Sequence, residues 1–342
     1  MQRLLIPIFL VLSIQSCEKE NPDPVSLDIQ KPSEITETSF QLNWTTSNQN
    51  FQAIAIDLSL DRDMEVIEEH VAISDATQEN YLFTSKKGAT KYYYKISLIR
   101  DGETVVHSDL YGVETSYSAQ GITLVTADSM NLKGSIAYLE SNSGARPGII
   151  MMHELGVWVN PWIGSALLKR LVSEGYVCMT FLFRGHGTSS PIEGGLMTLV
   201  DDKSLIAKDL DAAISFMNDN EMVAQGKLGL VGASLGGIMA LAGNGYEEVL
   251  TSVSLSAPAD GVYEIFPGMT LSSAFYLAGE LDIRPEMNAD FPRDAEILFN
   301  STDLPKKLTI VAGTADHGTT LLSRDELNVS IQEWIMETLP LD

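Results

Sequence analysis

The stretch from Lys227 to Ala240 constrains the fold more than any other part of the sequence. An apolar run, Leu228–Val231, leads directly into Gly-Ala-Ser-Leu-Gly-Gly at residues 232–237, and small or helix-forming residues follow. A Gly-x-Ser-x-Gly pattern between a strand and a helix places its serine on a sharp turn, where the glycines leave room for a crowded backbone. Gly and Ser also occur in plain turns, so the pattern alone does not decide whether Ser234 is a nucleophile. The other strands, helices and partner residues of the chain have to decide it.

The length and the charge of the chain limit its class. With 342 residues it is long enough for about two domains of ~150 residues each. Acidic residues outnumber basic residues by 46 to 22, and the net charge of -24 argues against nucleic acid or an anionic membrane surface as a partner. Cys17 and Cys178 lie in different settings, so a disulfide between them is not expected. Cys178 stands in an apolar run and is expected to be a small buried residue.

The first 16 residues have the layout of a secretory signal peptide. One basic residue precedes a mostly apolar stretch, residues 4–13, which is too short to span a membrane as a stable helix. Residues 14–17, Ile-Gln-Ser-Cys, resemble the lipobox of bacterial lipoproteins, although Gln stands where a small residue is usual. The resemblance implies that Cys17 is acylated and anchors the protein to a membrane of the cell envelope, with the outer membrane favoured, and that residues 17–23 form a tether. The alternative is an ordinary secreted protein that is cleaved nearby.

Residues 24–116 are expected to form a small all-β domain. Short apolar runs recur with turn residues between them, and few segments have helical spacing. Phe40–Trp44 and residues 92–98 alternate apolar and polar positions, and Asp101-Gly102 is typical of a hairpin turn. The early tryptophan and the late Tyr-x-Tyr-x-Ile strand resemble a fibronectin type III domain. No catalytic constellation occurs here, so the domain is expected to serve as a spacer or a docking surface.

From residue 121 to residue 342 the pattern changes to alternating strands and helices. After a short linker, residues 117–120, two strands are expected to pair around Asp128–Asn131, and from Pro147 onward strand and helix alternate. This alternation predicts an α/β fold with a doubly wound, mostly parallel sheet. Buried strands are expected at residues 148–152, 176–183, 228–231, 252–255, 274–278 and 308–312, and helices at residues 162–172, 201–218 and 326–337. Ser234 then follows a central strand, at the edge of the sheet where such folds carry their chemistry.

The layout resembles an α/β-hydrolase of the dienelactone-hydrolase and small-esterase type over essentially all of residues 121–342. That family carries its triad in the chain order serine, acid, histidine. Ser234 is followed by a single histidine, His317, which lies just past the last expected strand. Asp282 ends a Gly-Glu-Leu-Asp segment that matches the family's Gly-x-x-Asp turn, and the match implies that it orients the imidazole.

Two further acids are alternatives to Asp282. Glu280 lies two residues earlier in the same turn, and Asp260 ends an earlier strand, where some relatives keep their acid. A mere turn residue or helix cap is the other explanation for Asp282 itself.

The resemblance also implies an oxyanion hole. The backbone amide of Leu235, the residue after the nucleophile, supplies one donor. The segment His-Glu-Leu-Gly at residues 153–156 is similar to the family's His-Glu-x-x-Gly loop, and by that match Leu155 donates the second hydrogen bond. In relatives a glutamate at the position of Glu154 can approach the resting nucleophile, and its role beside a serine is left open.

Motifs for metals and cofactors do not occur in the sequence. A helical zinc motif that starts at His153 requires a second histidine where Val157 stands. The segment Arg-Gly-His-Gly at residues 184–187 resembles a family loop, with Leu182 in place of the usual aspartate, and His186 is expected to be structural because it precedes the nucleophile. Glycine motifs for phosphates or dinucleotides are missing as well, so neither a metal nor a cofactor is expected.

Together these features predict an envelope-anchored serine hydrolase. We expect a carboxylic ester hydrolase that acts on a small-molecule or glycan ester through an acyl-enzyme at Ser234, with Asp282 and His317 completing the triad. Residues 256–294 leave room for a small cap at most, which predicts an open site suited to polar or bulky substrates. A serine peptidase of the same fold and a binding lipoprotein with a silent site are the alternatives.

Overall fold

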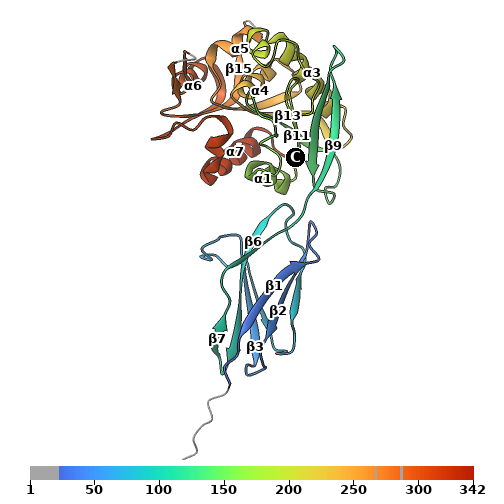
Figure 1. Cartoon of the computed structure of the whole chain (residues 1–342), viewed down its shortest axis with the longest axis vertical. Coiled ribbons are helices and arrows are strands. Elements are labelled where there is room, and N and C mark those ends of the chain that lie inside the picture. Colours follow the sequence, from blue (N-terminus) through green and yellow to red (C-terminus); the bar gives the residue numbers. More distant parts are fainter. Residues whose placement is uncertain (1–22, 266–267, 286–287) are drawn as a thin grey trace, which may run out of the picture. The chain divides into compact units, whose positions relative to one another are not determined.

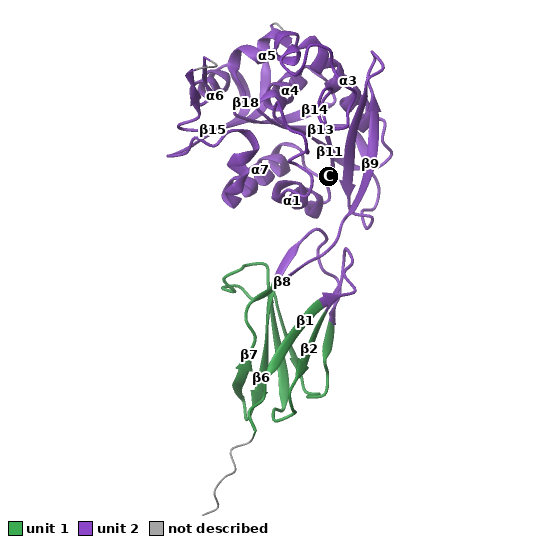
Figure 2. Ribbon diagram, viewed as in Figure 1, with its two compact units in different colours: residues 1–31, 42–81, 93–111 green, residues 32–41, 82–92, 112–342 purple. Residues whose placement is uncertain are grey.

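A computed structural model describes residues 23–265, 268–285 and 288–342. Figure 2 shows that the chain divides into two units, one made of residues 1–31, 42–81 and 93–111 and the other of residues 32–41, 82–92 and 112–342. The expected leader, residues 1–16, and Cys17 lie outside the described residues. No helix within the described ranges is both long and apolar enough to cross a membrane.

The N-terminal strands form two sheets with a shared aromatic core. One sheet has the order β1-β2-β5, and the other has the order β4-β3-β6-β7 with β8 paired to β6. The strands are β1 (Leu27–Ser33), β2 (Phe40–Thr46), β3 (Ala53–Ser59), β4 (Glu69–Ile73), β5 (Asn80–Phe83), β6 (Lys91–Arg100), β7 (Glu103–His107) and β8 (Tyr111–Glu114). Every second residue of β2 and β6 is buried, and the rings of Phe40 and Tyr92 lie 5.5 Å apart. The expected all-β domain is therefore confirmed, and the tyrosines at positions 92 and 94 belong to its core.

An eight-stranded sheet forms the centre of the second unit (Figure 1). Its order is β18-β15-β14-β13-β11-β12-β10-β9. The strands are β9 (Ser118–Val125), β10 (Asn131–Tyr138), β11 (Arg146–Met152), β12 (Val177–Phe181), β13 (Val223–Ala233), β14 (Val249–Leu255), β15 (Leu271–Gly279) and β18 (Thr302–Val311). The six strands from β18 to β12 are parallel, while β10 and β9 run antiparallel at one edge. The predicted α/β fold with a mostly parallel sheet is confirmed.

Helices cover this sheet on both faces (Figure 1). They are α1 (Ala166–Glu174), α2 (Thr198–Asp201), α3 (Ser204–Asn218), α4 (Leu235–Ala242), α5 (Ala259–Ile265), α6 (Phe291–Asn300) and α7 (Asp325–Thr338). Helices α3 to α6 share one apolar cluster with one face of the sheet, and α1 and α7 share a second cluster with the other face. Strands covered on both sides need continuous apolar runs, and all five residues of β12 are buried.

The boundaries differ from the sequence expectations in a few places. Strand β9 begins at Ser118, inside the expected linker, because residues 118–120 pair with β10. The helix expected from residue 201 begins at Ser204, after the separate short helix α2. Between residues 256 and 294 the chain forms α5, the central strand β15, a two-stranded hairpin, β16 (Ile283–Arg284) and β17 (Ala289–Asp290), and the start of α6. Outside the central sheet, the described part of this segment therefore holds short elements only.

Candidate active site

Ser234 occupies a strained turn between β13 and α4. Its φ of 51° and ψ of -110° lie in a region that non-glycine residues rarely adopt. The two glycines of the motif make this turn possible. A Cβ on Gly232 would lie 1.9 Å from the carbonyl oxygen of Gly236, and a Cβ on Gly236 would lie 2.3 Å from the carbonyl oxygen of Met152. The Gly-x-Ser-x-Gly segment therefore folds as a sharp turn between a strand and a helix, here called the elbow, which is the geometry expected around a nucleophilic serine.

The elbow stands at the carboxyl end of a central strand. Strand β13 lies between β11 and β14, and the amide of Ser234 donates a 2.8 Å hydrogen bond to the carbonyl of Leu255 at the end of β14. Ser234 is half-buried, whereas the helix that follows it is buried throughout. Its hydroxyl makes no hydrogen bond to another residue in the described part of the chain. The helix N-terminus behind the serine favours negative charge near it.

His317 and Asp282 form a hydrogen-bonded pair on the loops that follow β18 and β15. The His317 Nδ1 atom lies 2.7 Å from Asp282 Oδ2, and the Asp282 side chain is completely buried. Since a carboxylate oxygen only accepts, the ring proton resides on Nδ1, and Nε2 is left to act as a base. The His317 ring also packs on Phe291, with the ring centroids 4.5 Å apart.

The two alternative acids are placed differently. Glu280 is exposed and accepts a 2.7 Å hydrogen bond from the amide of Gly313. Asp260 is exposed in the first turn of α5. Of the three acids, Asp282 is the one that the structure brings into contact with His317.

The histidine reaches the elbow through the loop that carries it. A Cβ on Gly318 would lie 3.3 Å from the Cβ of Ala233, the residue before the nucleophile. The amide of Gly318 donates a 3.2 Å hydrogen bond to Ser256 Oγ, just past the end of β14. The residue after His317 thus lies against the residue before Ser234, although no hydrogen bond joins the side chains of His317 and Ser234 within the described residues. Catalytic hydrogen bonds are often long in the absence of substrate and shorten when it binds.

The expected oxyanion donors lie on the two loops beside the serine. The amide of Gly236, in the first turn of α4, donates a 3.2 Å hydrogen bond to the carbonyl of His153. This contact brings residues 153–156, here called the oxyanion loop, against the elbow. Neither the amide of Leu235 nor that of Leu155 has an acceptor among the described residues, so both remain available to an oxyanion.

Two buried histidines hold the oxyanion loop in place. His153 Nδ1 donates to the carbonyl of Glu154 at 2.7 Å, and its Nε2 accepts from the amide of Phe183 at 3.1 Å. His186 Nε2 accepts a 3.0 Å hydrogen bond from the amide of Gly156. Burial lowers the pKa of His153 to about 3 and also lowers the pKa of His186, so both rings are neutral near pH 7. Both nitrogens of each ring bond to the backbone, which is a structural role.

Arg184 is the centre of a buried ion cluster that the sequence did not reveal. Its Nε donates to Asp209 Oδ1 at 2.8 Å, and its two terminal nitrogens donate to the two oxygens of Asp128 at 2.8 and 2.9 Å. The hydrogen bonds from Arg184 hold the pKa of Asp128 well below its usual value, while burial raises the pKa of Asp209 to about 6. Asp128 and Asp209 together accept the side-chain hydrogen bonds of Arg184.

The described residues contain no cluster of side chains that is typical of a metal site. No group of three or more His, Cys, Asp or Glu side chains there is arranged to hold a metal ion. Cys178 is buried and free in β12, where burial raises the pKa of its thiol above the ordinary range.

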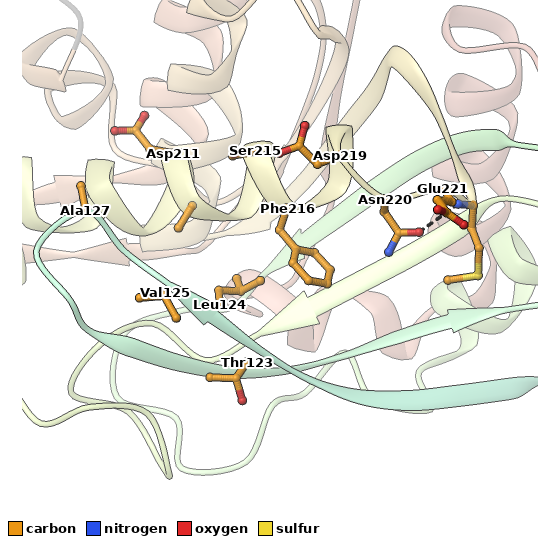
Figure 3. Close-up of a pocket in the computed structure, with 12 residues that line it drawn as sticks. Thr123, Leu124, Val125, Ala127, Asp211, Ser215, Phe216, Asp219, Asn220 and Glu221 are labelled. Carbon is orange, nitrogen blue, oxygen red and sulfur yellow. Dashed lines mark hydrogen bonds between the residues drawn. The ribbon is translucent and has the colours of Figure 1, made fainter.

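A separate hollow of about 800 Å³ lies between β9 and α3 (Figure 3). Its wall includes Leu124, Val125 and Phe216 together with the carboxylates of Asp211 and Asp219. None of the candidate catalytic residues lines it, so it is distinct from the site at the elbow.

Comparisons with known proteins agree with this architecture. Residues 149–332 match the model of the alpha/beta hydrolase family. A curated relative, the quorum-quenching protein AidA of Acinetobacter baumannii (strain MDR-ZJ06), is 32% identical over 135 residues, which are 39% of this chain and 43% of the relative. The chain thus matches less than half of the length of that relative.

Solved structures show the same fold at low sequence identity. An acetyl xylan esterase from Paenibacillus sp. R4 superposes with a TM-score of 0.50 and 15% identity, over 64% of this chain and 84% of the esterase. The alpha/beta hydrolase GrgF from Penicillium sp. sh18 superposes with a TM-score of 0.50 and 16% identity, over 65% of this chain and 99% of GrgF. The family model spans more than half of the chain and includes the elbow, the acid turn and the histidine loop. This chain belongs to the alpha/beta hydrolase family.

Proposed function

We propose that the protein is a serine hydrolase that cleaves carboxylic esters through an acyl-enzyme. The observation that carries the proposal is the His317–Asp282 pair beside the strained Ser234 turn, because the carboxylate accepts from Nδ1 and leaves Nε2 as the ring nitrogen that can act as the base. Members of the alpha/beta hydrolase family use this arrangement for acyl transfer.

The reaction follows from the positions of these groups. Ser234 Oγ attacks the ester carbonyl carbon while His317 Nε2 takes the hydroxyl proton, and Asp282 stabilises the imidazolium that forms. The tetrahedral intermediate collapses when His317 returns the proton to the leaving alkoxide, which departs as the alcohol. Water then repeats the sequence on the acyl-enzyme and releases the carboxylic acid and free Ser234.

The amides of Leu235 and Leu155 are the donors that we assign to the oxyanion. Leu235 lies in the first turn of α4, and Leu155 lies in the oxyanion loop, where the amide of the next residue, Gly156, is held by His186. Such preorganised donors stabilise the charge that develops on the carbonyl oxygen, and the loss of one typically costs about 3 to 4 kcal/mol of transition-state stabilisation.

A fluorophosphonate probe tests the serine mechanism directly. We expect the wild-type protein to react covalently at Ser234 and to hydrolyse p-nitrophenyl esters, while folded Ser234→Ala does neither. Dipeptidyl anilides assayed in parallel distinguish an ester hydrolase from a peptidase of the same fold. Folded wild-type protein that does not react with the probe would show that the fold serves binding and not hydrolysis. Because a relative is named for quorum quenching, inactivation of quorum signals is a further assay.

The proposal extends to the location of the enzyme. Cys17 ends a lipobox-like segment, and acylation there would hold the enzyme at the cell envelope, with the fibronectin type III-like residues 24–116 as a spacer. We expect the wild-type protein to incorporate labelled palmitate and to sediment with outer membranes. Equal labelling of Cys17→Ala would contradict the anchor.

A further inference from the structure

We infer that Glu154 is a positioning residue that joins the oxyanion loop to the loop of the catalytic histidine. Thr319 Oγ1 donates a hydrogen bond to Glu154 Oε1, across 165 residues of sequence. Glu154 immediately precedes Leu155, the proposed oxyanion donor, and Thr319 lies two residues after His317. The inference rests on the proposed serine hydrolase function. It assigns a role to Glu154, which is not a member of the triad.

The oxyanion loop is anchored on both sides of Leu155. The carbonyl of Glu154 accepts from His153 Nδ1, and the amide of Gly156 donates to His186 Nε2. Together with the hydrogen bond from the amide of Phe183 to His153 Nε2, these bonds fix the loop against the segment that follows β12. The Glu154 carboxylate is the group that connects the same loop to the opposite wall of the site.

The histidine loop, residues 314–320, has its own anchors. The Asp282 carboxylate holds the His317 ring, and the amide of His317 donates a 2.9 Å hydrogen bond to Thr320 Oγ1. Next to them, Gly318 is buried between the two walls, since a Cβ there would lie 3.3 Å from Ala233 Cβ and 3.5 Å from Glu154 Oε1. The Glu154–Thr319 bond therefore closes a ring of contacts around the elbow.

The other oxygen of the same carboxylate shows that this placement has an energetic cost. Glu154 Oε2 is buried and has no hydrogen-bond partner among the described residues. A buried acceptor without a partner loses its hydration without compensation, so an apolar side chain of similar size would avoid that loss. A local cost of this kind beside a reaction centre is expected where a group serves function and not stability.

The consequence for catalysis is a defined distance between base and oxyanion donor. Catalysis requires that His317 Nε2 and the Leu155 amide reach the same tetrahedral centre on Ser234, and small displacements reduce the rate steeply. Without the Glu154–Thr319 bond each loop keeps its own anchors but can move relative to the other. The chemical step then slows, while groups that bind the remote parts of the substrate are unchanged.

The test compares paired substitutions on each side of the bond. Thr319→Val and Glu154→Leu remove it, whereas Thr319→Ser and Glu154→Gln keep a hydroxyl donor and a carbonyl acceptor. We expect the first two to lower kcat on p-nitrophenyl acetate about tenfold with little change in KM. A tenfold loss corresponds to the free energy of about one lost hydrogen bond. The second two should stay within about threefold of wild type, and Thr319→Val/Glu154→Leu should lose no more than either single variant, because both break the same interaction.

The controls separate positioning from folding and from the proposed function. Thr309→Val removes a threonine hydroxyl on β18 and should leave kcat unchanged, and Tm is measured for every variant. Equal kcat for Thr319→Val and Thr319→Ser, additive losses in the double variant, or a fall in Tm with unchanged kcat would each overturn the role of Glu154. If one Thr319 variant does not fold, the Glu154 pair gives the same comparison. Wild-type protein that neither hydrolyses esters nor reacts with a fluorophosphonate would overturn the proposed function instead.

Discussion

His317 Nδ1 lies 2.7 Å from Oδ2 of Asp282, a carboxylate that solvent does not reach. Because that oxygen can only accept, it favours the tautomer with the proton on Nδ1, in which Nε2 can act as the base. The same bond holds the ring in one orientation before substrate binds. The second oxygen, Oδ1, accepts from Arg284 Nε at 3.2 Å. Both oxygens of the buried carboxylate thus have partners, which fixes the acid as well as the base.

Substitutions at these residues should affect the reaction unequally. Ser234→Ala and His317→Ala remove the nucleophile and the base, so we expect each to lower kcat by about 10⁶-fold. Asp282→Asn keeps the shape but not the charge, and we expect a loss of about 10⁴-fold. Stopped-flow and steady-state ester hydrolysis measure these values, with circular dichroism to confirm folding.

The alternative acids provide the matched comparison. Glu280→Gln and Asp260→Asn should keep kcat within about threefold of wild type, because neither carboxylate contacts His317. A loss at either position as large as that of Asp282→Asn would show that Asp282 was assigned wrongly. Full activity in His317→Ala would exclude that residue as the base.

Acid should destabilise the protein through its buried histidines. Burial lowers the pKa of His153 to about 3 in the folded protein, against about 6.5 in an unfolded chain. Between these values the unfolded state binds more protons, so the free energy of unfolding falls by about 1.4 kcal/mol per pH unit as the pH drops below ~6.5. Urea unfolding of wild type and His153→Asn from pH 7.5 to pH 4 measures the effect.

The comparison with His153→Asn is needed because other groups titrate in the same range. Burial raises the pKa of Asp209 to about 6, and this shift stabilises the folded protein as the pH falls. Asp209 titrates in both proteins, so its contribution cancels in the difference between the free energies of unfolding of wild type and His153→Asn. It should shrink as the pH falls below ~6.5, and a constant difference would contradict the neutral buried ring.

The Arg184 cluster should dominate the stability of the segment after β12. Asp209→Ala leaves a buried guanidinium with one partner fewer, and we expect a loss of about 3 kcal/mol in the free energy of unfolding. Asp128 is one-third exposed, so Asp128→Ala should cost less. Lys208→Ala is the control, since this more exposed side chain contacts the same Asp128 from solvent and should cost under about 1 kcal/mol. Equal losses in all three variants would contradict the burial argument.

Much of the fold could be predicted because its signals are local. The buried runs of β11, β12 and β13 show as continuous apolar sequence, and Gly175 ends α1 with a φ of 110°, which glycine adopts without strain. Helix α6 was missed even though Asp290 caps its N-terminus. Residues 291–300 are amphipathic, but the helix is short. Strands β15 and β18 lie on either side of it in sequence, so the helical periodicity extends over few turns.

The candidate site divides in the same way. Ser234, Asp282 and His317 carry motif and chain-order signals, which a single sequence contains. The contacts of Glu154 with Thr319 and of Arg184 with Asp209 join segments far apart in sequence. A threonine in a loop or an aspartate on a helix has no special pattern, because its role depends on the tertiary neighbour alone.

Exposed apolar side chains beside the oxyanion loop should determine which esters the enzyme prefers. Trp158 and Val159 are 76% and 79% exposed, three and four residues after Leu155, so they can cover the apolar chain of a bound substrate. We expect Trp158→Ser to lower kcat/KM for p-nitrophenyl octanoate about fivefold more than for p-nitrophenyl acetate, because only the longer acyl group buries apolar area against the indole. Val125→Ser, which changes a 64% exposed side chain on β9, should leave the ratio of the two esters unchanged. An equal loss on both esters in Trp158→Ser would indicate a general effect on the loop, and an unchanged ratio would place the acyl chain elsewhere.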